Sequence, residues 1–301
     1  MKWRDVRVGS EILTLARSLG ARSIFVVGTA RDVGKTTALR SIYAAACAEG
    51  ARIGIASIGR EGDATTRGDA HPKPRIRLEP QTLFVTARGS LPRSPACEIV
   101  KLSGLRSPAG PLLYARVSAA ALYELVGPPT ASGVREVVEE LSARGDLVLV
   151  DGAVDRVAAL AGSDGAIVVA CGAASAPTMQ ESVDEAAALV ARLRLPPYDP
   201  TAPAMHLEGG LTASRAAALI AARETRQIVV RDPTQVALGG KSATQALALL
   251  RLRCERPLRV IAATVASIAP DRTFEPRAFA DAVAAATGLP AFDVYAGARA
   301  A

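Results

Sequence analysis

Short apolar runs alternate along the chain with longer segments rich in Ala and Leu. The apolar runs predict six strands, at Ser23–Val27, Arg52–Ser57, Leu147–Val150, Ala166–Ala170, Gln227–Val230 and Val260–Thr264. The segments between them predict six helices, at Thr37–Glu49, Gly133–Arg144, Gln180–Leu193, Thr212–Ala222, Thr244–Leu252 and Pro276–Thr287. Apolar strands that alternate with helices are typical of a parallel sheet covered on both faces. We therefore predict a three-layer α/β fold with a mainly parallel sheet.

Residues 60–118 interrupt this alternation after the second predicted strand. Seven prolines break the region into short pieces, at Pro72, Pro74, Pro80, Pro92, Pro95, Pro108 and Pro111. Because proline disrupts helix interiors and central strands, we predict an irregular, Pro- and Arg-rich insertion here. Two interpretations stay open. The insertion either covers one edge of the sheet or forms a substrate or partner surface.

The alternation resumes after the insertion, so we expect a single domain over residues 1–301. It comprises a strand–helix–strand unit at 21–58, the insertion at 60–118, and the remaining strands and helices at 145–301. The chain carries a net charge of +7, but its basic residues are scattered and only 4% of its residues are aromatic. Because base stacking needs aromatic side chains and phosphate binding needs clustered cations, nucleic-acid binding is disfavoured.

The chain shows no membrane or disulfide signature. No run approaches the roughly 18 apolar residues that a bilayer span requires, and the N-terminus lacks an apolar secretory segment. The four cysteines are widely spaced without a CxxC pair, and neither of the two histidines is near a cysteine. We therefore expect a cytoplasmic protein with reduced thiols and no zinc site.

The stretch "SIFVVGTARDVGKTTALRSIY" at residues 23–43 carries the clearest chemistry. An apolar strand is followed by a glycine-containing turn and then by a helix, which is the context of a phosphate-binding loop. Gly34 allows backbone amides to approach phosphate oxygens, and Lys35 is placed to bridge the β- and γ-phosphates. The hydroxyl of Thr36 is expected to bind Mg²⁺, and Thr37 to reach the α-phosphate.

A second GK[ST] occurs at Gly240-Lys241-Ser242 and serves as an internal comparison. It lacks the upstream glycine, and the preceding strand is predicted to end at Val230, about ten residues earlier. We therefore interpret Lys241 as a residue at the start of a helix.

A carboxylate that could serve the same metal follows a buried strand in "GDLVLVDGAVDR". Asp151 lies at the carboxyl end of this strand, where it can hold Mg²⁺ directly or through a water. Beyond the second strand, Asp63 is a further candidate for the metal shell and Asp69 competes with it. The guanine-reading N-K-x-D motif is absent, and Asp232 in "VRDPT" is a positional candidate for contact with a nucleobase.

The loop "GTARDVGKT" resembles that of the dethiobiotin synthetase family, which reads G-T-x-x-[DE]-V-G-K-T. The match covers Gly28, Thr29, Asp32, Val33, Gly34, Lys35 and Thr36. The family belongs with the cobyrinic acid amidating synthases and the Min and Par ATPases among the P-loop NTPases. The resemblance implies ATP with Mg²⁺, commonly a homodimer, Asp151 in place of a metal-binding glutamate, and a contact of Asp32 with substrate or backbone. Lys35, Asp151 and Asp32 are then the expected catalytic residues.

The chain also departs from these relatives. After the second strand it reads "SIGREGD" where dethiobiotin synthetases carry a substrate-binding Lys-Pro, and Ala30 stands where Min and Par proteins have an extra lysine. The first hypothesis is therefore an accessory ATPase that acts on a partner protein. The segments "SIGREGD", "VDGAVDR" and "VRDPT" also resemble those of ATPase-like accessory proteins of cobalamin-dependent aminomutases, which implies a reactivating role. The second hypothesis is an ATP-dependent ligase that activates a carboxylate or carbamate on a small anionic substrate.

Overall fold

The computed structural model describes residues 6–58, 75–152 and 164–295, except for the side chains of residues 240 and 241. Its contacts divide the chain into two compact units, which are taken separately below. The first unit comprises Met1–Val26 and Lys35–Ala159, and the second comprises Val27–Gly34 and Leu160–Ala301. The first strand therefore begins in one unit and ends in the other.

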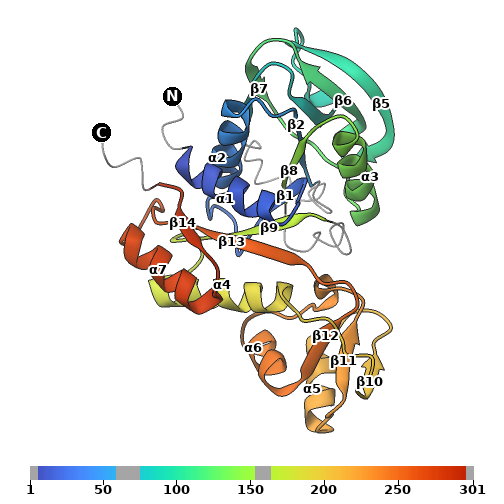
Figure 1. The fold of residues 1–301 in the computed structure, drawn as a ribbon, viewed down its shortest axis with the longest axis vertical. Helices are drawn as coiled ribbons and strands as arrows, with labels where there is room; N and C mark the ends of the chain where they lie inside the picture. Colours follow the sequence, from blue (N-terminus) through green and yellow to red (C-terminus); the bar gives the residue numbers. More distant parts are fainter. Residues whose placement is uncertain (1–5, 59–74, 153–163, 296–301) are drawn as a thin grey trace. The chain divides into compact units, whose positions relative to one another are not determined.

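The first unit contains a mainly parallel sheet and three helices (Figure 1). Its helices are α1 (Arg7–Ser18), α2 (Lys35–Ala48) and α3 (Ala131–Ser142). Its strands are β1 (Ser23–Gly28), β2 (Ile53–Ser57), β3 (Ile76–Leu78), β4 (Leu83–Ala87), β5 (Cys97–Ser107), β6 (Gly110–Val117), β7 (Ala121–Tyr123) and β8 (Leu147–Asp151). The strand order is β1-β8-β2-β4-β6-β5, in which the first four strands are parallel and the last two antiparallel.

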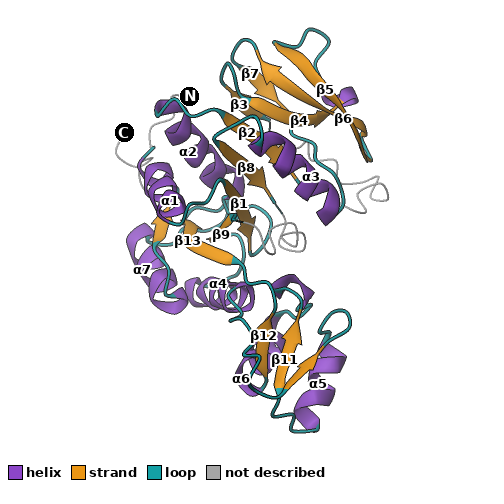
Figure 2. Ribbon diagram, turned by 45° about the vertical axis from the view of Figure 1, so that its right-hand side comes forward, coloured by secondary structure: helices purple, strands orange, loops and turns teal. Residues whose placement is uncertain are grey.

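Helices cover both faces of this sheet. Figures 1 and 2 show α2 and α3 on opposite sides of β8 and β2. Every residue of β1 is buried, as is Leu147–Val150 of β8, which explains why both strands are continuously apolar. The layers of the first unit are thus compatible with the predicted three-layer α/β fold.

The prediction of irregular structure is wrong for the part of the insertion that the structure describes. Strand β4 pairs with β2 and with β6, and β5 pairs with β6, so the region extends the sheet. Four of its prolines (Pro80, Pro92, Pro95 and Pro108) lie between strands. Pro111 is the second residue of β6, and residues 72 and 74 lie outside the described residues. Proline at turns and strand ends removes no central hydrogen bond, so the strands form between the prolines.

The second unit contains a parallel sheet of β14-β13-β9 and a separate parallel sheet of β10-β11-β12. Its strands are β9 (Ala166–Gly172), β10 (Ala204–His206), β11 (Gln227–Val230), β12 (Arg251–Cys254), β13 (Arg259–Ala266) and β14 (Ala291–Asp293). Its helices are α4 (Met179–Leu193), α5 (Ala213–Ala221), α6 (Gly240–Leu249) and α7 (Pro276–Thr287). Helices α4 and α7 pack side by side on one face of β13, around buried Phe279 and Val283 (Figure 1). The expected α/β class with mainly parallel sheets is therefore confirmed.

One helix was predicted too far toward the C-terminus. The segment Thr244–Leu252 was expected to be helical, but α6 ends at Leu249 and Arg251–Cys254 forms β12. Leu252 and Cys254 are buried in the core of the small sheet, paired with Ile228 and Val230. The short apolar pattern at residues 250–254 fits either a helix or a strand, and these residues form a strand because they pair with β11. Helix α6 begins at Gly240, so Lys241 does stand at a helix start, as predicted.

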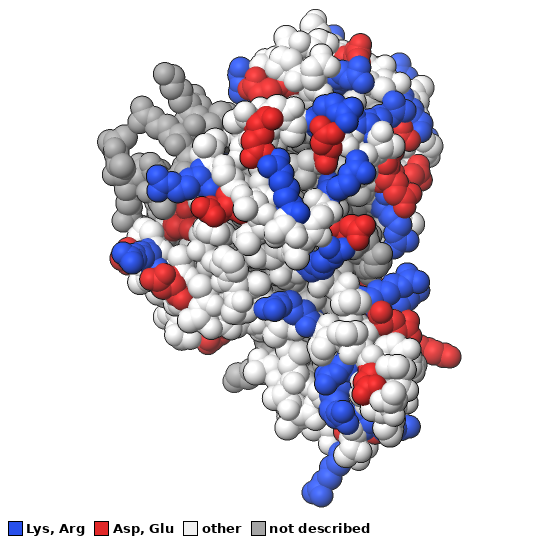
Figure 3. All heavy atoms as spheres, in the orientation of Figure 1, with Lys and Arg blue, Asp and Glu red and all other residues white. Residues whose placement is uncertain are grey.

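The charged surface and the cysteines can be compared with what the composition led us to expect. On the face shown in Figure 3, basic and acidic side chains are interspersed. All four cysteines are free thiols. Among the described residues, no helix combines the length and apolar character that crossing a bilayer requires.

Candidate functional site

The predicted strand, turn and helix are present at the phosphate-loop motif. Strand β1 ends at Gly28 and α2 begins at Lys35, which leaves residues 29–34 as the loop. Asp32 and Gly34 have positive φ values of 56° and 82°, whereas Val33 between them does not. Alternation of this kind turns successive backbone N–H groups toward one side and forms a concave anion-binding nest. The positive φ values at Asp32 and Gly34 are compatible with the predicted phosphate loop.

Within the second unit, small residues at the strand ends allow the loop to pack closely. The Thr29 amide donates to the Ala170 carbonyl of β9 at 3.0 Å, and the Val33 side chain is buried. A Cβ atom at Gly172 would lie 3.0 Å from the Val33 Cα, and one at Gly34 would lie 2.9 Å from the Ala266 Cβ. A side chain at either glycine would therefore require the loop or the residues packed against it to shift.

Within the first unit, the start of α2 lies next to the end of β8. In the sheet register, Asp151 stands opposite Val26 of β1 on one side and Ser57 of β2 on the other. The Thr36 Oγ1 donates a hydrogen bond of 3.3 Å to the Asp151 Oδ2. Two residues predicted as metal ligands, 115 positions apart in sequence, are thus in contact.

The remaining predicted residues take varied positions. Gly28 is the buried last residue of β1, Lys35 and Thr37 are partly buried in the first turn of α2, and the Asp32 side chain is exposed. The Thr29 Oγ1 is buried, and within the described part of the chain it has no hydrogen-bond partner. An ordered water or a ligand normally satisfies such a group.

Of the other predicted carboxylates, two lie outside the described residues and the third has a structural role. Asp63 and Asp69 lie outside the described residues. Asp232 is buried after β11, where its carboxylate accepts from the backbone N–H and the hydroxyl of Thr234. It caps the short helix η3 (Pro233–Gln235), a structural role that its position in the sequence did not indicate.

The donor set of Thr36 and Asp151 fits Mg²⁺ bound together with a nucleotide. Over residues 6–58, 75–152 and 164–295, no three His, Cys, Asp or Glu residues are grouped so that they could hold a metal alone. Mg²⁺ is usually bound by one or two protein oxygens, several waters and the phosphates of a substrate. The Thr36 hydroxyl and the Asp151 carboxylate therefore suffice as protein ligands for such an ion.

Sequence reasoning did not single out Ser57 in the first unit, or Gly172 and Ala266 in the second. The available signal was their position, since each lies at or just after the carboxyl end of a predicted strand, where parallel α/β sheets bind ligands. The tight packing of Gly172 on Val33 could not be read from the chain, because 139 residues separate the two in sequence.

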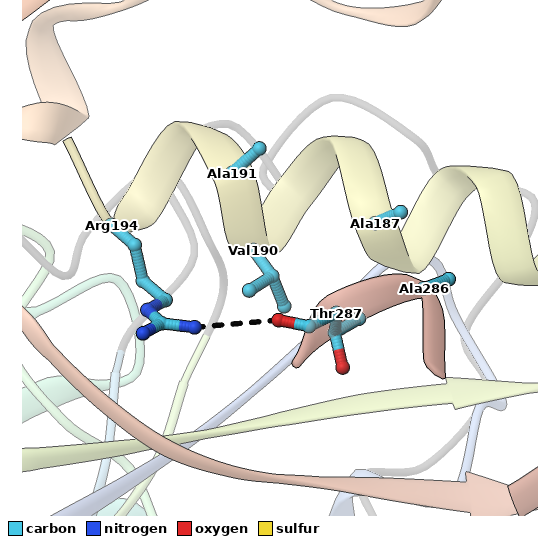
Figure 4. Close-up of a pocket in the computed structure, with 6 residues that line it drawn as sticks. All are labelled: Ala187, Val190, Ala191, Arg194, Ala286 and Thr287. Carbon is cyan, nitrogen blue, oxygen red and sulfur yellow. Dashed lines mark hydrogen bonds between the residues drawn. The ribbon is translucent and has the colours of Figure 1, made fainter. Parts of the chain in front are cut away.

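A separate groove lies between α4 and α7 and involves none of the predicted site residues (Figure 4). Ala187, Val190 and Ala191 line it from α4, and Arg194 donates across it to the Thr287 carbonyl at 3.3 Å.

No protein-family model matches the sequence, and a search of the curated proteins finds no match.

Proposed function

We propose that this protein is a Mg²⁺-dependent P-loop ATPase. The observation that supports the proposal most is the hydrogen bond between Thr36 and Asp151. A chance GKT sequence before a helix has no reason to lie beside an aspartate at the end of a neighbouring parallel strand. In nucleotide hydrolases that pairing has a purpose, because both groups serve one metal ion.

Each residue has a role that follows from its chemistry. The amides of residues 29–34 and of the first turn of α2 hold phosphate oxygens. The Lys35 ammonium neutralises charge on the β- and γ-phosphates, and Thr36 and Asp151 hold the metal through oxygen. When bound, Mg²⁺ stabilises the charge that develops on the phosphates during transfer. Asp32 is exposed in the loop, where it can contact substrate or neighbouring backbone.

The biological role of ATP hydrolysis is inferred from the sequence. The absence of a lysine in "SIGREGD" favours an accessory ATPase that acts on a partner protein, including one that reactivates a cobalamin-dependent aminomutase. The similarity of the loop to dethiobiotin synthetases supports the alternative, a ligase that phosphorylates a carboxylate or carbamate. ATP is preferred to GTP on the same resemblance.

The chain offers a matched control for testing nucleotide binding. Lys35→Ala removes the predicted phosphate ligand, and Lys241→Ala removes the lysine of the second GK[ST] sequence at the start of α6. Loss of charged hydrogen bonds to phosphate should weaken ATP binding about 10- to 100-fold in Lys35→Ala, measured by titration calorimetry. Lys241→Ala should bind as the wild type does. Normal ATP binding and hydrolysis by a folded Lys35→Ala variant would contradict the proposal.

A stimulation assay separates the two roles. A carboxylate-activating ligase should turn over ATP slowly alone and faster with a small carboxylic acid, with transfer of the γ-phosphate to that acid. An accessory ATPase should ignore such acids and respond to a protein. Asp151→Asn should remove Mg²⁺-dependent turnover in either case, because the amide no longer supplies a negative charge to the metal.

A further inference from the structure

The carboxyl end of β2 places a hydroxyl group beside the Thr36–Asp151 pair. Ser57 is the last residue of β2 and stands opposite Asp151 in the parallel register. Residues paired in this way point their side chains to the same face of the sheet and lie about 5 Å apart. The Ser57 side chain is therefore on the same face as the Asp151 carboxylate.

The position of Ser57 is held by the backbone. The Ile58 amide donates to the Asp151 carbonyl at 2.8 Å, which continues the pairing of β2 and β8 past Ser57. On the other side of β8, the Gly152 amide donates to the Val26 carbonyl at 3.0 Å. Asp151 is thus fixed between β1 and β2, with Thr36 bonded to its Oδ2 and Ser57 on the neighbouring strand.

The Ser57 hydroxyl is weakly used in the protein itself. Its hydrogen bond within the described residues runs from Oγ to the Ile58 carbonyl at 3.4 Å, whereas hydroxyl bonds are normally 2.5–3.0 Å. The side chain is partly buried at the strand end. The hydroxyl can therefore turn to a better partner without breaking a strong bond.

We propose that Ser57 is a positioning residue of the magnesium site. Its hydroxyl hydrogen-bonds a water of the Mg²⁺ shell beside Asp151 and so orients the metal that Thr36 and Asp151 hold. The proposal rests on the proposed function, and it gives β2 a role in the site through a described residue, whereas Asp63 was the sequence-based candidate from the same strand end. Groups that orient metal-bound ligands typically change metal affinity 10- to 100-fold when removed.

The test measures metal affinity separately from catalysis. Mn²⁺, a paramagnetic substitute for Mg²⁺, is titrated by EPR into the protein saturated with a non-hydrolysable ATP analogue. Ser57→Ala should weaken Mn²⁺ binding about tenfold, and should leave binding of the analogue in EDTA unchanged. Ser57→Thr, which keeps the hydroxyl and suits a strand, should restore most of the affinity.

Ser142→Ala is the matched control. Ser142 has the same partial burial, and it ends α3 near the opposite, amino-terminal edge of the sheet, where Arg22 bonds to its carbonyl at 3.0 Å. It should bind Mn²⁺ as the wild type does. Wild-type Mn²⁺ affinity in Ser57→Ala overturns the Ser57 proposal alone, as does an equal loss of analogue binding with and without metal. A wild-type protein that binds no nucleotide overturns the proposed function and this inference together.

Discussion

Gly34 is the position where the backbone of the predicted phosphate loop and its packing can be tested together. Its φ of 82° is unfavourable for any residue with a side chain, and its Cβ would lie 2.9 Å from the Ala266 Cβ and 3.3 Å from the Val294 Cγ2. Gly34→Ala therefore introduces two penalties, backbone strain and a collision. Gly50 has a φ of 73° and nothing within 4 Å of its Cβ position, so Gly50→Ala introduces the backbone strain without the collision.

The difference between the two alanine variants gives the magnitude. Each carries left-handed strain of about 1–2 kcal/mol, reduced by about 0.4–1 kcal/mol because alanine also restricts the unfolded chain. These terms cancel in the comparison. What remains is the overpacking against Ala266, which should lower the free energy of unfolding of Gly34→Ala by about 1–3 kcal/mol more than that of Gly50→Ala.

Urea unfolding followed by circular dichroism measures both variants. If the collision is the cause, adding Ala266→Gly to Gly34→Ala should recover about 0.5–3 kcal/mol in a double-mutant cycle. Calorimetric titration should also show weaker ATP binding in Gly34→Ala, since the loop must move away from β13, and unchanged binding in Gly50→Ala. Equal losses of stability in the two variants, without coupling to Ala266, would refute the reasoning.

The remaining predictions concern ionisation and capping. The Arg52 guanidinium lowers the pKa of Asp146 to about 2. The ion pair of Asp146 with Arg52 therefore stabilises the folded protein fully above the ordinary aspartate pKa of about 4, and this stabilisation is lost as the pH falls toward 2. In Arg52→Gln the Asp146 pKa, followed by NMR, should rise toward 4, and an unchanged titration would contradict the pairing. Burial raises the pKa of the Cys171 thiol to about 12, so partly exposed Cys47 should react with a thiol reagent well before it, as mass spectrometry of timed samples would show. Thr178→Ala removes the capping box of α4 and should lower the free energy of unfolding by about 1 kcal/mol in urea, whereas Thr178→Ser should preserve it.

The sequence by itself determined the elements whose signals are local. An apolar strand, a glycine-containing turn and a helix start all fall within residues 23–43, so the order strand, turn and helix could be predicted from that segment alone. The bounds of β11 and α7 agree residue for residue with the prediction. Such features depend on the side chains and backbone preferences of residues that are adjacent in the sequence, so the sequence alone is sufficient to predict them.

Only the tertiary structure decided the features that depend on distant partners. Helix α1 has a glycine at its third residue, Gly9, because a Cβ there would lie 2.1 Å from the Ser41 carbonyl oxygen of α2. The strands of the insertion form because β4 pairs with β2 and with β6. The prolines between these strands made the region look irregular in the sequence. The register of β2 and β8 is what places Ser57 opposite Asp151. Pairing across a sheet depends on which strands become neighbours, and one chain read in isolation does not specify that choice.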